Sequence, residues 1–267
     1  MKLAFSPCPN DTFVFHAWTH GLVPSAPRVD VTYAGIDITN TAAEHGEFDV
    51  VKVSYAALPW LLDKYRLLPA GGALGRGCGP LVLTREGQTS VSGLTVAVPS
   101  ERSTAYLLFR LWSAGQHPAS IEVVPFADIM PGVRDGKYDA GLVIHEARFV
   151  YQDFGLTSMV DLGEWWEADT GLPIPLGAII AKRHLDTEAL IRVIRASVEY
   201  AWAHPEASAD YVAEHAAEMS PDVQRRHIDL YVNEFTRDLG EEGYTAIETL
   251  LGRAHREGLI PARPIVR

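Results

Sequence analysis

The side chain best suited to acid–base chemistry lies in the apolar run GLVIHE, at 141–146. This run predicts a strand with His145 at its end, and imidazole is the side chain that ordinarily titrates near neutral pH. His145 could therefore act as a general base, although a lone histidine more often has a structural role. Its neighbour Glu146 would face the opposite side of the strand, so its part in the chemistry stays open. A zinc-protease motif is absent, because position 149 is Phe instead of a second His.

Two further segments have the residue types of an anion-binding site. In KVSYAA (52–57), Lys52 lies near a strand end and Ser54 is placed to cap the next helix. An ammonium, a hydroxyl and helix amides would then meet at one point. A surface lysine beside a routine serine cap explains this pattern equally well. In SERSTAYLLF (100–109), Ser103 or Thr104 is predicted to cap a helix, which would place hydroxyls on the second wall of a cleft.

The segment SPCPNDTF (6–13) ends one strand and begins a helix, with Asn10 or Asp11 as the predicted cap. Helix amides there could bind a polar ligand group, but a rigid turn with an N-cap accounts for the same residues and is the more common case. Cys8 has no neighbouring base in the sequence, so a nucleophilic role is not expected.

Glycine and tryptophan mark two other segments. GGALGRGCGP (71–80) has no GK[ST] ending, so close backbone approach near a cleft or hinge is favoured over phosphate binding. In GEWWEADTGLPIPLG (163–177), Trp165 or Trp166 could wall a cleft, and packing at a junction between lobes fits as well.

Short apolar, β-branched runs alternate with helical stretches, which is typical of an α/β fold with mixed, mostly parallel sheets flanked by helices. Strands are predicted at 3–6, 29–35, 49–54, 80–85, 94–99, 121–126, 139–145, 158–163 and 176–183. Helices are predicted at 10–20, 39–45, 54–64, 103–114 and 128–134, and then through a helical C-terminal segment at 186–203, 205–217, 221–232 and 240–257.

Two stretches could carry the chain between lobes, at 80–93 and at 163–177. They predict a larger, discontinuous lobe, 1–85 with 174–267, and a smaller lobe, 86–173. Ligands of such proteins bind at strand C-termini in the cleft between the lobes. Lys52 and Ser54 would then form one wall, and Thr104 with His145 the other.

Composition narrows the choice of partner. The 267 residues carry a net charge of −11, which opposes binding to nucleic acid and to anionic membranes. An acidic chain can still bind a small anionic molecule where the positive potential is local, as at a helix N-terminus. The two cysteines, Cys8 and Cys78, are expected to be reduced and too few for a zinc site. Ser6 and Pro7 interrupt the apolar start, so no secretion signal is expected and the chain is predicted to be cytoplasmic.

Taken in order, six segments resemble the 1,4-dihydroxy-6-naphthoate synthase family of the futalosine route to menaquinone. They are SPCPNDTF, KVSYAA, the glycine-rich GGALGRG with the following GPL, STAY, GLVIHE and DLGEWWEADTGLPIPLGAI. The resemblance runs from Leu3 to about His204 and continues through YVNEF (231–235).

The resemblance implies a two-lobed fold of the periplasmic-binding-protein type II kind, without a secretion signal. It implies a lyase that converts cyclic dehypoxanthinylfutalosine to 1,4-dihydroxy-6-naphthoate, with no metal or organic cofactor. By resemblance His145 is the proton acceptor, and the substrate-binding stretches correspond to Lys52, Val53 and Ser54, and to Thr104 and Ala105. Chorismate dehydratase of the same pathway and a non-catalytic solute-binding protein are the alternatives.

Overall fold

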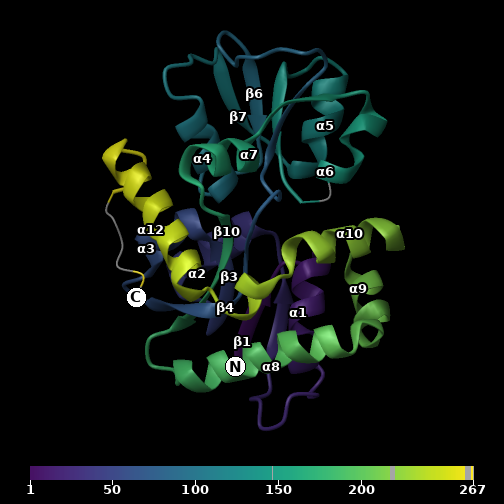
Figure 1. Cartoon of the computed structure of the whole chain (residues 1–267), viewed down its shortest axis with the longest axis vertical. Helices are drawn as coiled ribbons and strands as arrows, with labels where there is room; N and C mark the ends of the chain where they lie inside the picture. Colours follow the sequence, from purple (N-terminus) through teal and green to yellow (C-terminus); the bar gives the residue numbers. More distant parts are fainter. Residues whose placement is uncertain (146, 217–219, 262–265, 267) are drawn as a thin grey trace.

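The computed structural model describes residues 1–145, 147–216, 220–261 and 266. Its strands form two five-stranded sheets that lie one above the other (Figure 1). The first sheet has the order β2-β1-β3-β10-β4, and its strands are β1 (Lys2–Phe5), β2 (Asp30–Tyr33), β3 (Val50–Ser54), β4 (Tyr65–Gly75) and β10 (Ile174–Lys182). The second has the order β7-β6-β8-β5-β9, and its strands are β5 (Leu81–Thr84), β6 (Thr95–Val98), β7 (Ser120–Val123), β8 (Ala140–Val143) and β9 (Thr157–Asp161).

Both sheets mix the two strand directions, which confirms the predicted α/β class. In the first sheet β1 pairs in parallel with β2 and β3, whereas β10 runs antiparallel to β3 and β4. In the second sheet β6 pairs in parallel with β7 and β8, whereas β5 runs antiparallel to β8 and β9. The carboxyl ends of the parallel strands β3 and β8 carry Ser54 and lead to His145, where open sheets usually present their chemistry.

Helices cover both sheets, and the C-terminal third is helical as predicted. The longer helices are α1 (Pro9–Thr19), α2 (Ile36–His45), α4 (Thr104–Trp112), α5 (Phe126–Arg134), α7 (Leu162–Thr170), α8 (Thr187–Ala203), α9 (Ala209–His215), α10 (Pro221–Tyr231) and α12 (Gly240–Arg256). The shorter turns are η1 (Tyr55–Ala57), α3 (Leu58–Leu61), α6 (Ala147–Val150), η2 (Tyr151–Phe154), η3 (Pro205–Ser208) and α11 (Glu234–Arg237). Helix α10 lies between the two sheets, below α6 (Figure 1).

We propose that the two sheets mark two lobes, the first built from 1–80 and 174–267 and the second from 81–173. The sequence placed the first crossing after residue 85. However, β5 pairs with β8 and β9, so 81–84 belong with the second sheet. The chain returns to the first sheet at β10, close to the predicted position 174.

Strand β4 was not predicted, because Pro69 and three glycines interrupt its sequence, YRLLPAGGALG. Among the described strands it lies at the edge of its sheet and pairs only with β10, through a ladder with two register shifts. Proline is tolerated on an edge strand, where a missing N–H removes no ladder bond. The predicted helix 54–64 is correspondingly shorter, and only η1 and α3 form there.

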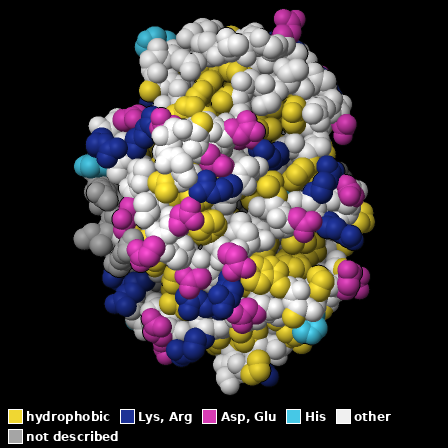
Figure 2. Space-filling model, in the orientation of Figure 1, with side chains coloured by type: hydrophobic (Ala, Val, Ile, Leu, Met, Phe, Trp, Pro, Cys, Tyr) yellow, Lys and Arg dark blue, Asp and Glu magenta, His cyan; other side chains and the backbone are white. Residues whose placement is uncertain are grey.

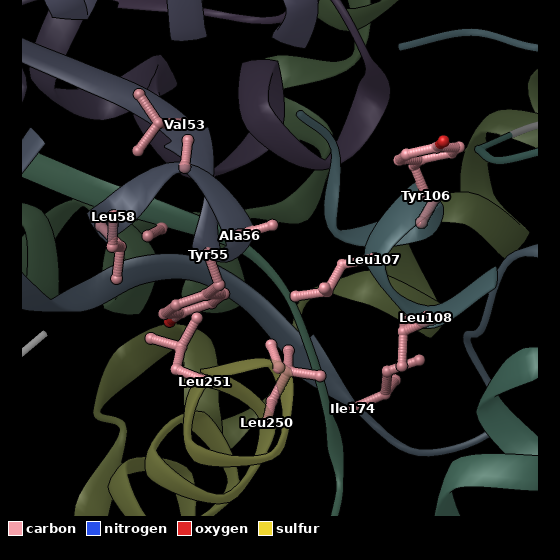
Figure 3. Close-up of a cluster of buried hydrophobic side chains, with 14 of the residues drawn as sticks. Val53, Tyr55, Ala56, Leu58, Tyr106, Leu107, Leu108, Ile174, Leu250 and Leu251 are labelled. Atoms are coloured by element: carbon pink, nitrogen blue, oxygen red, sulfur yellow. The ribbon is translucent and has the colours of Figure 1, made fainter. Parts of the chain in front are cut away.

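A buried hydrophobic cluster joins elements of both sheets (Figure 3). Tyr55 follows β3, Ile174 begins β10, and Leu107 belongs to α4 over the second sheet. Leu250 and Leu251 of α12 complete the cluster from the C-terminal segment and are almost fully buried. The two sheets are therefore packed against one another beside the cavity described below.

The glycine-rich segment brings backbones together, as the sequence predicted. A Cβ atom on Gly79 would lie 2.0 Å from the backbone nitrogen of Gly163, at the start of α7. A Cβ atom on Gly72 would lie 2.8 Å from the carbonyl oxygen of Gly177 in β10. Backbone atoms of paired elements cannot rotate aside, so only glycine fits at these positions.

Gly79→Ala is expected to lower the free energy of unfolding by about 1–3 kcal/mol, because the added methyl group overpacks this contact. Gly87→Ala is the matched control, since no atom lies within 4 Å of its added Cβ. That control should change stability by about 0.5 kcal/mol or less. Denaturant unfolding measures both variants, and equal stabilities would contradict the assignment of the close contact.

One face of the surface mixes both signs of charge, with Lys and Arg side chains interspersed among Asp and Glu (Figure 2). This mixed face lacks the continuous basic stripe that binds nucleic acid. Among the residues with described positions, no helix has the length and apolar character needed to cross a membrane.

Candidate active site

A cavity lies between the two sheets and takes its walls from both. Its empty space, with the open mouth and the solvent there included, is about 640 Å³. It contains most of the predicted site residues. Its polar lining consists of Ser6, Asn10, Asp11, Lys52, Ser54, Ser103, Thr104, His145, His227 and Tyr231.

His145 stands just beyond β8 with a left-handed backbone, at a φ of 56°. Such a conformation is uncommon for residues other than glycine and costs roughly 1–2 kcal/mol in L-residues. Strain of this kind persists where the surrounding structure fixes it, often at functional sites. Glu146, whose role the sequence left open, lies outside the described residues.

The imidazole of His145 contacts Cys8, whose Sγ lies 2.9 Å from Nδ1. Cys8 precedes α1 at the end of β1, so this contact joins the loops of the two sheets. The sequence analysis found no base near Cys8, because its partner His145 is 137 residues away along the chain. The hydrogen bond fixes the ring of His145 at the wall of the cavity.

Asn10 and Asp11 lie in the first turn of α1, and neither caps it. Cys8 occupies the N-cap position without a side-chain bond, and Pro9 begins the helix. The prediction of an Asn10 or Asp11 cap is therefore wrong. The Asp11 carboxylate instead pairs with the Lys52 ammonium and accepts a 2.8 Å hydrogen bond from the Ser6 hydroxyl.

The Lys52–Asp11 pair is almost fully buried, with the two side chains 6% and 2% exposed. The sequence treated Lys52 as a cation for the ligand, but its charge is already balanced by Asp11. Burying two charges is costly, and only a close pair with further hydrogen bonds offsets that cost. Asn10 supplies one of these bonds, since its Nδ2 donates to Asp11 Oδ1 at 2.9 Å.

Ser54 begins η1 at the end of β3, as predicted, but its side chain makes no cap bond. The hydroxyl oxygen accepts instead from Asn40 Nδ2 at 3.1 Å, and the Asn40 carbonyl accepts from the Ser54 N–H at 2.8 Å. Within the described part of the chain, the Ser54 hydroxyl proton has no acceptor. Ser54 can therefore donate this proton to a ligand. The sequence did not point to Asn40, because an asparagine within a helix has no distinctive pattern.

The helix start on the second wall forms as predicted. Ser103 caps α4, and its hydroxyl accepts from the Tyr106 N–H at 3.1 Å. Thr104 lines the cavity and also connects the two sheets, because its hydroxyl donates to the Leu176 carbonyl at 2.9 Å and accepts from the Ala56 N–H at 3.2 Å. Ala105 lies beside them in the cavity wall.

Three residues considered at the sequence level do not line the cavity. Val53 points away from Lys52 and Ser54, as strand alternation requires, and lies in the hydrophobic cluster of Figure 3. Trp166 is fully buried and donates to the Pro173 carbonyl at 3.1 Å. Trp165 packs under Arg253 at 5.1 Å. The two tryptophans serve packing, and the alternative that they wall the cleft is wrong.

His227 of α10 lines the cavity and was missed by the sequence analysis. It is 2% exposed, and its Nε2 lies 3.0 Å from Asn10 Oδ1. Burial, with smaller contributions from His145 and Lys52, lowers the pKa of His227 from 6.5 to about 3. The imidazole is therefore neutral at pH 7.

This shift makes stability depend on pH. Between pH 6.5 and about 3 the unfolded chain binds a proton at His227 that the folded chain does not. The stability is fully present above pH 6.5 and is lost as the pH falls towards 3. Over that window the free energy of unfolding of the wild type should fall more steeply than that of His227→Gln, by up to about 1.4 kcal/mol per pH unit. Denaturant unfolding at several pH values measures both slopes, and parallel slopes would contradict the shift.

Comparison with known families connects this site to quinone biosynthesis. A family model described as menaquinone biosynthesis matches residues 1–256 of the chain. The match covers both sheets and all the cavity residues named above.

Similar proteins agree with this match. The 1,4-dihydroxy-6-naphthoate synthase of Streptomyces coelicolor is 65% identical, over 98% of this chain and 95% of that protein. The synthase of Thermus thermophilus is 46% identical, over 99% of this chain and 97% of that protein. Among solved structures, the periplasmic aliphatic sulphonate binding protein of Escherichia coli has a TM-score of 0.70 at 13% identity, over 100% of this chain and 90% of that one. That likeness shows a periplasmic-binding-protein-like fold.

Proposed function

We propose that this chain, which belongs to the menaquinone biosynthesis family and within it to the 1,4-dihydroxy-6-naphthoate synthases, converts cyclic dehypoxanthinylfutalosine in its interlobe cavity with His145 as general base. The enzymes of this kind are lyases. The cavity between the two sheets, with walls from both, supports a reaction on a bound small molecule.

The position of His145 is the observation on which the proposal depends. Its imidazole lines the cavity from a strained backbone, and Cys8 holds Nδ1 from the opposite loop. A positioned imidazole can remove a proton next to an electron-withdrawing centre of the substrate. Aromatisation of the ring then drives cleavage of the carbon–carbon bond, and the sugar-derived fragment leaves.

We further propose that the polar residues on the cavity walls hold the substrate. The Ser54 hydroxyl can donate a hydrogen bond to a carboxylate oxygen of the substrate. Thr104 already donates its proton to the Leu176 carbonyl, so it holds the cavity wall in place instead of donating to the substrate. Ser103 and Ala105 line the wall beside it. Holding the substrate in one orientation supplies much of the catalytic effect, because it removes the entropy cost of a productive encounter.

An assay with two substrates tests this function. Purified chain is incubated with cyclic dehypoxanthinylfutalosine and, separately, with chorismate. We expect 1,4-dihydroxy-6-naphthoate from the first and no consumption of the second. Consumption of chorismate would indicate the dehydratase of the same pathway, and binding of either compound without turnover would indicate a solute-binding protein.

A further inference from the structure

His227 has a buried nitrogen that the proposed mechanism does not use. The residue belongs to α10, from the C-terminal segment, and lines the cavity with its ring centre 6.1 Å from that of His145. Its Nδ1 atom is buried and has no hydrogen-bond partner among the described residues. Buried polar atoms without partners are rare in folded proteins, so such an atom on a cavity wall points to a ligand.

The neighbours of His227 determine which of its nitrogens carries the proton. The Asp11 carboxylate can only accept hydrogen bonds when it is ionised and paired with Lys52, so the amide nitrogen of Asn10 must face it. The carbonyl oxygen of Asn10 therefore faces His227, at 3.0 Å from Nε2. A carbonyl oxygen only accepts, so Nε2 carries the proton.

A neutral imidazole with its proton on Nε2 has a bare lone pair on Nδ1. Burial keeps the ring neutral at pH 7, since it lowers the pKa of His227 to about 3. Nδ1 is consequently an acceptor. It can bind a hydroxyl group, whereas the lone pairs of a carboxylate would be repelled by it.

We propose that Nδ1 of His227 accepts a hydrogen bond from a hydroxyl of the sugar-derived part of the substrate. This inference rests on the proposed function. It also orients the substrate, because the accepting Nδ1 of His227 belongs to α10, whereas the donating hydroxyl of Ser54 lies at the end of β3. The sugar-derived part would lie towards α10, and the carboxylate towards Ser54.

Two substitutions distinguish the roles of the two ring nitrogens of His227. In His227→Gln the amide nitrogen can still donate to Asn10, but nothing replaces the acceptor at Nδ1. In His227→Asn the shorter amide can place an oxygen near the Nδ1 position. We expect His227→Gln to raise KM for the cyclic substrate about tenfold or more with a smaller effect on kcat, as for loss of a buried hydrogen bond. His227→Asn should regain part of this loss, and His117→Gln on the exposed surface should match the wild type.

A substrate analogue without the sugar-derived hydroxyls distinguishes recognition from structure. Wild type and His227→Gln should bind this analogue equally, because the hydrogen bond is missing in both cases. A loss of affinity in His227→Gln that is as large for the analogue as for the substrate would overturn the proposal. So would an unchanged KM in His227→Gln while the wild type forms naphthoate. If the wild type forms no naphthoate, it is the proposed function that fails.

Should His227→Gln not fold, nuclear magnetic resonance of ¹⁵N-histidine protein gives the same decision. The cyclic substrate itself is the probe and is added to the His145→Asn variant. The comparison compound is 1,4-dihydroxy-6-naphthoate. The Nδ1 signal of His227 should shift on addition of the substrate and stay in place with the product, which lacks the sugar-derived part. An unmoved Nδ1 signal at saturating substrate would overturn the proposal.

Discussion

His145→Asn and His145→Ala are each expected to lower kcat for naphthoate formation by about 10²–10⁴-fold, the contribution of a positioned general base. Substrate affinity should change far less, because the other cavity residues remain in place. Product formation gives kcat, and calorimetric titration with the substrate gives the dissociation constant.

The two His145 variants control for the strained backbone. Asparagine adopts the left-handed conformation at φ 56° more readily than alanine does, so the conformational strain is larger in the alanine variant. His145→Ala should therefore have the lower melting temperature, while the loss of kcat should be equal in both. Near-normal turnover by a well-folded His145→Asn would rule out His145 as the base.

Lys52→Met is expected to lower the free energy of unfolding by about 3–5 kcal/mol, since it leaves the Asp11 carboxylate buried without its counter-charge. Naphthoate formation should fall as well, because Asp11 and Asn10 form part of the cavity wall. Denaturant unfolding monitored by circular dichroism measures the change in stability.

The double variant Lys52→Met/Asp11→Asn should regain most of that stability, because neither buried charge remains. A double variant as unstable as the sum of the single losses would show that the two side chains act independently. Lys182→Met is the matched control. Its partner Asp49 lies 3.2 Å away and both side chains are about a quarter exposed, so the loss should be about 1 kcal/mol or less.

Local sequence patterns predicted the elements that carry the site. An apolar run ending in His145 predicted the strand now seen as β8, and a hydroxyl before a helical stretch predicted the Ser103 cap. The alternation of strands and helices predicted the α/β class. These features depend on neighbouring residues, so a single sequence contains them.

Contacts between distant segments could not be predicted. His227 is 217 residues from Asn10, and no local pattern sets it apart from other histidines on amphipathic helices. The pairing of Asp11 with Lys52 was missed because Asp11 fits an N-cap equally well from its sequence. Strand β4 was missed because proline and glycine are typical of loops, and only its place at a sheet edge reconciles them with a strand.

A crystal structure of His145→Asn with cyclic dehypoxanthinylfutalosine tests most directly whether the interlobe cavity is the reaction site. We predict the substrate between the Ser54 wall and the Thr104 wall, with a substrate carbon about 3.5 Å or less from the place of the imidazole, as a productive geometry requires. A second, more open groove is lined by residues that include Asp37, Thr41 and Arg102. Substrate bound there at saturation, with the cavity empty, would contradict the account.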